Sequence, residues 1–200
     1  MIDYGATRAV TLVTGRSGTG KTTFALRYLV NASHLRGRWI WDADGQISAR
    51  LGLPAASTAD ELEASLEDGW SIFDPNSMFP GRHGEGFAWF ASWAYAAAAR
   101  TPGPSVLLVD EVWRYCTPHA IPQPLAECIQ TGRVRGLSCM FATQRPNRLN
   151  GAVVNEVTEC VAFRLQDRMG LAIVDECGLP AAEVSALVPG SWLAVSCETG

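Results

Sequence analysis

Lysine and positive charge are both scarce in this sequence. Lys21 is the only lysine among its 16 lysines and arginines, and the formal net charge is −4 over 200 residues. A protein with this charge does not hold nucleic acid by being basic over its whole surface, so any contact with nucleic acid must be local. The avoidance of lysine everywhere else makes position 21 conspicuous.

Paired cysteines, a signal peptide and a membrane span are missing as well. None of the six cysteines belongs to a CxxC pair, which favours buried thiols in a reducing compartment. The N-terminus lacks the basic-then-apolar pattern of a signal peptide, so we expect no secretion. No uncharged stretch is longer than residues 86–99, which is shorter than the roughly 20 residues that span a bilayer and predicts a buried or interface helix.

Apolar runs and helix signals alternate along the chain. An apolar content of 48% with 18% charged residues is typical of a globular protein, and we expect residues 1–200 to form a single domain. Predicted buried strands occupy residues 8–14, 38–42, 70–74, 105–110, 137–143, 159–165 and 191–197. This alternation predicts an α/β fold of three layers, in which helices flank a mostly parallel central sheet.

The predicted helices carry recognisable start signals. They occupy residues 21–32, 86–99 and 123–131. Thr58 with Glu61 forms a capping box for another helix that ends before Gly69, and Pro180 opens a further short one. On the first helix the side chains expected to face the core are Phe24, Leu26, Leu29 and Val30.

A phosphate-binding loop follows the first predicted strand. Residues 15–22, GRSGTGKT, match G-x-x-x-x-G-K-[ST] between a strand and a helix, as a P-loop requires. Lys21 would bridge the β- and γ-phosphates of a nucleotide, and Thr22 would place its hydroxyl on Mg²⁺. A dinucleotide fingerprint fits poorly, because Thr23 stands where its third glycine belongs. The predicted nucleotide-binding residues are Gly15, Arg16, Ser17, Gly18, Thr19, Gly20, Lys21, Thr22 and Thr23.

Two carboxylates lie at the end of the predicted strand at residues 105–110. Asp110 is its last residue, and Glu111 follows directly. The run VLLVDE places Asp110 and Glu111 at the carboxyl end of a buried strand, where ligands of parallel sheets bind. Asp110 is the expected Mg²⁺ partner together with Thr22. Glu111 is placed to orient and deprotonate water, which a hydrolase needs and a phosphotransferase avoids.

The strand at residues 137–143 has polar groups at both ends. We expect this strand to lie beside the P-loop strand, so Gln144, which follows it, can contact the γ-phosphate or the attacking water. Arg133 and Arg135 precede it, at the opposite end of the sheet from the nucleotide. Neither arginine can easily serve its own site, so each is a candidate arginine finger for a neighbouring subunit, with Arg133 the first choice.

The combination of these segments resembles a known family. The P-loop, the hydrophobic strand ending in DE, and the run from Arg133-x-x-Gly136 to FATQRP at residues 141–146 are similar to the FtsK–HerA superfamily of DNA-pumping ATPases. The resemblance covers roughly residues 9–197. The minimal members of that superfamily are the genome-packaging ATPases of tailless icosahedral viruses with an internal membrane, and they are the best match.

The resemblance implies a P-loop NTPase fold of the RecA/ASCE type, with ATP and Mg²⁺ as cofactors. It also implies an oligomeric ring, with a hexamer as the first expectation, that translocates double-stranded DNA. Proteins of a capsid vertex or of the viral membrane are further expected partners. The expected location is the host cytoplasm or the packaging vertex of the virion.

Alternatives remain open from the sequence. A small-molecule or nucleotide kinase shares the size and the P-loop, and a filamentous-phage assembly ATPase resembling zonula occludens toxin shares the motor class. A non-catalytic ATP-binding scaffold is a third option, whereas a GTPase is disfavoured by the absence of an NKxD motif. No basic stripe marks a DNA-binding surface, so the candidate DNA contacts are the isolated residues Arg82, His83 and Arg148.

Overall fold

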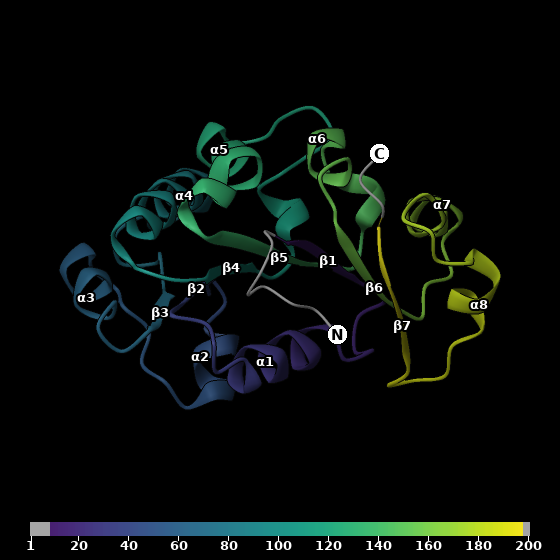
Figure 1. Ribbon diagram of the computed structural model, residues 1–200, viewed down its shortest axis with the longest axis horizontal. Coiled ribbons are helices and arrows are strands. Elements are labelled where there is room, and N and C mark those ends of the chain that lie inside the picture. The colour runs from purple at the N-terminus through teal and green to yellow at the C-terminus, as the bar shows by residue number, and fades with distance from the viewer. Residues whose placement is uncertain (1–8, 198–200) are drawn as a thin grey trace.

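A seven-stranded sheet forms the centre of the computed structural model, which describes residues 9–197 (Figure 1). The strands stand in the order β3-β2-β4-β5-β1-β6-β7, and all pair in parallel except β7, which runs antiparallel to β6. Their bounds are β1 Val10–Thr14, β2 Gly37–Trp41, β3 Trp70–Phe73, β4 Ser105–Val109, β5 Leu137–Thr143, β6 Glu159–Phe163 and β7 Trp192–Ser196.

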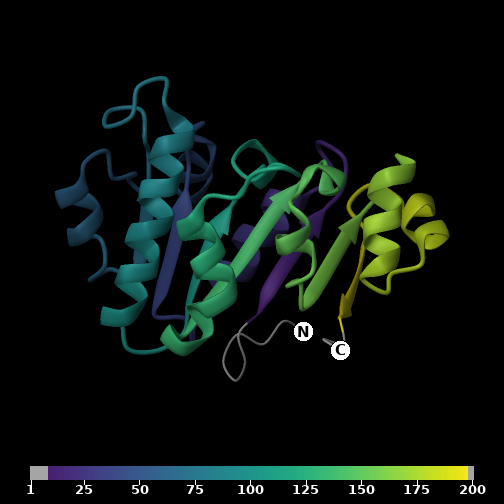
Figure 2. The same ribbon diagram turned by 90° about the horizontal axis from the view of Figure 1, so that it is seen from above.

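Helices cover both faces of the sheet (Figures 1 and 2). One face carries α1 (Lys21–Asn31) and α2 (Gln46–Leu51), and the other carries α4 (His83–Arg100), α5 (Gln123–Thr131) and α6 (Gly151–Val154). Beside β3 lies α3 (Ala59–Ala64), while α7 (Arg168–Glu176) and α8 (Ala181–Ala186) lie beside β7. Single 3₁₀ turns are η1 (Val112–Arg114), η2 (Gly132–Arg135) and η3 (Pro146–Arg148). The predicted α/β three-layer fold is confirmed.

Burial of the sheet on both faces explains the continuous apolar strands. In β2, Trp39 and Trp41 pack into the cluster under α4, whereas Ile40 between them packs into the cluster under α1. Alternate residues of a strand point to opposite faces, so a strand covered on both sides has few polar positions. All six cysteines are free thiols and five are buried, as predicted. No helix within residues 9–197 is both long and apolar enough to cross a membrane.

Several boundaries differ from the prediction. Helix α4 begins at His83, before the predicted start at residue 86, and α7 was not predicted at all. The expectation that Val30 faces the core is wrong, because 58% of it is exposed, and Phe24 is only half-buried. The first strand is described from Val10, and Arg8 lies outside the described residues.

A buried arginine joins α1 to the sheet. The Arg38 guanidinium, on β2, donates hydrogen bonds to the carbonyl oxygens of Leu29 at 2.8 Å, Leu35 at 3.2 Å and Ala32 at 2.6 Å. The last carbonyls of a helix have no partner within the helix, and a cation there also interacts favourably with the helix dipole. Arg38 therefore fixes the far end of the helix whose other end carries the P-loop.

Replacing Arg38 with Met is expected to lower the free energy of unfolding by about 2–4 kcal/mol, because three buried carbonyl oxygens lose their donor. Urea denaturation followed by circular dichroism measures the change. The exposed neighbour Arg36 is the matched control, and Arg36→Met should change the stability by less than about 0.5 kcal/mol. Equal effects of the two substitutions would contradict the role given to Arg38.

Candidate functional site

The loop between β1 and α1 has the backbone geometry that only glycine adopts easily. Gly15, Gly18 and Gly20 have φ angles of 151°, 76° and 109°. A Cβ atom on Gly15 would lie 2.5 Å from the Cβ of Phe163 on β6, so this position also lacks room for a side chain. The predicted P-loop therefore has both the conformation and the close packing that its glycines suggested.

Contacts within the loop centre on the backbone of Arg16. Its N–H donates to the carbonyl of Arg164 at 3.0 Å, and its own carbonyl accepts from the Thr19 hydroxyl at 2.8 Å and from Lys21 Nζ at 3.1 Å. Ser17 is exposed at the tip of the loop. The lysine ammonium thus lies inside the curve of the loop, where a phosphate would approach it.

Lys21 is a buried cation with only 6% of its surface exposed. Burial lowers the pKa of this lysine, while the negative charges of Glu111 and Asp110 oppose the shift. A phosphate beside Nζ would replace part of the lost hydration and favour the charged form. The electrostatics of the loop therefore suit an anionic ligand.

The structure brings Thr22 and Asp110 together. The Thr22 hydroxyl, in the first turn of α1, donates to Asp110 Oδ2 at 2.6 Å. Asp110 directly follows β4, which is separated from β1 by β5. A hydroxyl and a carboxylate are hard oxygen ligands, which Mg²⁺ prefers, and Mg²⁺ commonly takes only one or two carboxylates with the rest of its shell from water and substrate phosphate. No group of three or more His, Cys, Asp or Glu within residues 9–197 could hold a metal. The residues present fit Mg²⁺ bound with a nucleotide.

Glu111 has a strained backbone and a fixed carboxylate. Its φ of 49° makes it the one non-glycine residue with positive φ within residues 9–197. Its Oε2 accepts the indole N–H of Trp113 at 2.6 Å and the backbone N–H of Gln144 at 3.3 Å. Strain of this kind costs about 1–3 kcal/mol and is concentrated at functional sites. The prediction that Gln144 follows the strand beside the P-loop strand is confirmed, since β5 pairs with β1.

The two candidate finger arginines differ in their surroundings. Both belong to η2, at the end of β5 away from the P-loop. Arg135 donates to the Tyr95 carbonyl at 2.8 Å and stacks over the Tyr95 ring at 3.7 Å, whereas the exposed Arg133 side chain makes no hydrogen bond or ion pair with residues 9–197. Of these two arginines, only Arg133 has a guanidinium without a hydrogen bond or ion pair to residues 9–197.

The candidate DNA contacts all have partners within their own subunit. Arg82 forms an ion pair with Glu85 at 3.1 Å, and His83 shares a hydrogen bond with Asn76 at 2.9 Å. Arg148 lies over the ring of Trp113, with its Cζ 5.5 Å from the ring centroid. The three side chains therefore contact three different residues.

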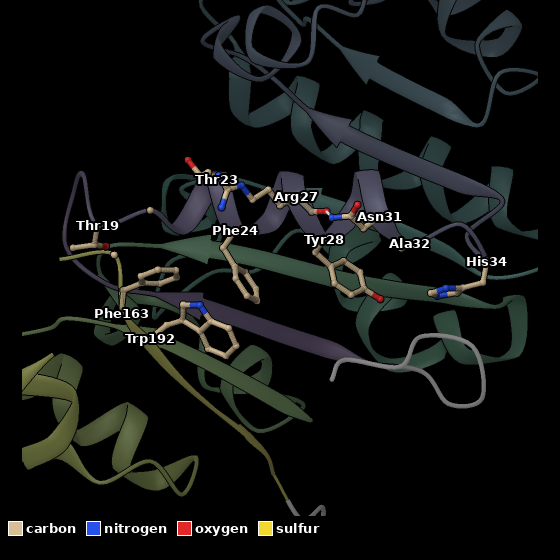
Figure 3. A pocket seen from close by; sticks show the side chains of 12 residues that line it. Thr19, Thr23, Phe24, Arg27, Tyr28, Asn31, Ala32, His34, Phe163 and Trp192 are labelled. Atoms are coloured by element: carbon tan, nitrogen blue, oxygen red, sulfur yellow. Dashed lines mark hydrogen bonds between the residues drawn. The ribbon is translucent and has the colours of Figure 1, made fainter. Parts of the chain in front are cut away.

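A pocket that the sequence did not reveal begins at the P-loop and extends along α1 (Figure 3). Its volume is about 600 Å³, and Thr19, Gly20 and Thr23 line the end next to the loop. Two aromatic rings from the sheet, Phe163 and Trp192, approach Phe24 of α1, at 6.0 and 5.2 Å between ring centroids. The remaining lining residues are Arg27, Tyr28, Asn31, Ala32, His34 and Gly190.

Comparison with known proteins places this arrangement in a structural class. No protein-family model and no curated protein matches the sequence. The genome packaging NTPase B204 of Sulfolobus turreted icosahedral virus 2, solved with AMPPCP, superposes with a TM-score of 0.78 at 16% identity, covering 99% of this chain and 95% of that one. The chain therefore shares the fold of that NTPase.

Two further structures agree. The DNA-packaging ATPase B204 of Sulfolobus Turreted Icosahedral Virus has a TM-score of 0.67 at 19% identity over 96% of this chain and 93% of its own. EssC (ATPases 2 and 3) of Geobacillus thermodenitrificans has a TM-score of 0.57 at 11% identity over 94% of this chain and 37% of its own. The expected α/β fold of a P-loop NTPase is therefore confirmed.

Replacing Gly15 with Ala is expected to lower the free energy of unfolding by about 2–4 kcal/mol, because it combines a strained φ with a clash against Phe163. Gly151→Ala is the control, since that glycine has open space around it and no positive φ. Chemical denaturation of the two variants measures the difference. Equal stability of both would show that the loop adapts to a side chain at position 15.

Proposed function

We propose that this chain is a Mg²⁺-dependent ATPase that, as a subunit of a ring, translocates double-stranded DNA and packages a viral genome into a capsid. The hydrogen bond from Thr22 to Asp110, at the edge of the sheet where Lys21 and Glu111 also lie, is the observation that carries the proposal. The fold shared with genome-packaging NTPases supports the motor function.

Each residue of the site has a distinct part in this proposal. Lys21 and the amides of the P-loop bind the phosphates, and Thr22 and Asp110 would hold Mg²⁺, which would supply positive charge next to the phosphate oxygens. Glu111 Oε2 is occupied by two N–H donors, while Oε1 has no hydrogen-bond partner within residues 9–197. Oε1 is therefore the atom that accepts a proton from the attacking water.

The aromatic pocket beside the loop suits the nucleoside part of ATP. A nucleotide whose phosphates bind at the P-loop would extend its ribose and base past Thr23, toward this pocket. At that point Phe24, Phe163 and Trp192 offer aromatic faces, and Arg27 offers a cation. Any nucleobase can stack on such rings, because every base has a π face.

Substituting Lys21 with Ala should abolish turnover and weaken ATP binding sharply, because the phosphate charge loses its one buried cation. Substituting Glu111 with Gln should abolish turnover while ATP binding changes less than about threefold, because the amide keeps its shape and loses the base. Isothermal titration and a phosphate-release assay measure both. Unchanged hydrolysis by a folded Lys21→Ala protein would refute the ATPase.

Replacing Trp192 with Ala should raise the Kd for ATP by about tenfold, the value of roughly one lost stacking contact. Binding of inorganic triphosphate to the same variant should stay within about twofold of the original protein, because it has no base to stack. Titration of both ligands separates the nucleoside contact from the phosphate contacts. An equal rise in Kd for the two ligands would show that the base does not bind in this pocket.

Arg133 is the proposed finger that acts on a neighbouring subunit. Subunits with Arg133→Ala lack the finger and subunits with Lys21→Ala lack a working P-loop, so mixed rings should regain activity where an intact loop meets an intact finger. Turnover of the mixture, with mixed assembly verified by size, measures the rescue. Failure of rescue would exclude Arg133 as a finger supplied by another subunit.

A further inference from the structure

Trp113 contacts the catalytic carboxylate directly. It lies in η1, two residues after Glu111, and is half-buried. Its indole N–H donates to Glu111 Oε2 at 2.6 Å, which is the shortest of the hydrogen bonds described for that side chain. A hydrogen bond from a neutral donor to a carboxylate is shorter and stronger than one between neutral groups. The orientation of Glu111 therefore depends on the indole.

The indole itself is held from a second direction. Arg145 and Arg148, in the segment after β5, lie over the Trp113 ring with their Cζ atoms 4.9 and 5.5 Å from its centroid. The Arg145 backbone N–H also donates to the Thr143 hydroxyl at 2.9 Å, which fixes the start of this segment. The two cations are attracted to the face of the indole by its ring quadrupole.

We propose that Trp113 is a positioning residue for Glu111, and that Arg145 and Arg148 hold Trp113 in place. The indole N–H and the backbone N–H of Gln144 both donate to Oε2 of Glu111. This leaves Oε1 for the water and limits the carboxylate to one orientation. A catalytic group held in its reactive orientation gains rate because fewer unproductive orientations compete. This inference rests on the proposed ATP hydrolysis.

Replacing Trp113 with Phe keeps a ring for the two arginines and removes the N–H. The kcat for ATP hydrolysis should fall by about tenfold, the effect of one hydrogen bond to a charged group, while KM and the Kd for ATP stay within about twofold. Trp93→Phe is the matched control, because the Trp93 indole N–H donates to the Glu63 carboxylate at 3.0 Å on α3, away from the site. Its kcat should be unchanged.

The same substitution in a Glu111→Gln background shows whether Trp113 acts through Glu111. If it does, adding Trp113→Phe should not lower the residual single-turnover rate further. A residue that merely supports the fold would cost the same factor in both backgrounds, and that result would overturn the inference. Arg145→Ala with Arg148→Ala should lower kcat by a smaller factor than Trp113→Phe, and should add nothing to it.

An NMR measurement tests the contact without any turnover. The indole ¹⁵N–¹H signal of Trp113, assigned by its absence in Trp113→Phe, should shift on Glu111→Ala, whereas the Trp93 signal should not. An unmoved Trp113 signal would refute the contact. A wild-type protein that does not hydrolyse ATP would refute the proposed function, whereas wild-type hydrolysis with unchanged kcat in Trp113→Phe would refute only the positioning role.

Discussion

The hydrogen bond between Thr22 and Asp110 depends on the order of the strands more than on either residue. β4 stands two places from β1, with β5 between them, so the ends of these strands lie about 10 Å apart at the usual strand spacing. The helix that begins at Lys21 brings the Thr22 hydroxyl over that gap to Asp110. The phosphate loop, the acidic strand and Gln144 thus meet at the carboxyl ends of the parallel strands β1, β4 and β5.

The length of β5 separates the nucleotide site from the candidate arginine finger. Gln144 follows the carboxyl end of β5, and its backbone N–H donates to Glu111. The finger candidate Arg133 precedes the other end of the strand. Seven residues of extended chain span roughly 20–23 Å, too far for an arginine side chain to reach back to its own nucleotide. A finger at that end therefore makes chemical sense only between subunits. The contact of Arg135 with Tyr95 leaves Arg133 as the available guanidinium.

Local patterns in the sequence predicted the parts of the site that each lie in one segment. The P-loop is a single run, Asp110 and Glu111 end one apolar strand, and the predicted bounds of α5 and β5 are those in the structure. The aromatic pocket was missed because Phe24, Phe163 and Trp192 come from three elements far apart in the chain. The contact of Trp113 with Arg145 and Arg148 was missed for the same reason, although its position two residues after Glu111 was a usable signal.

Dependence on DNA is the most direct test of the proposed motor. We would measure steady-state ATP turnover while duplex DNA of unrelated sequences is added at low and at moderate salt. The account predicts that turnover rises with DNA of any sequence and that the gain falls steeply with salt, because a few phosphate contacts per subunit are summed around a ring. Turnover that ignores DNA at low salt but increases with a small phosphate acceptor would contradict it and indicate a kinase.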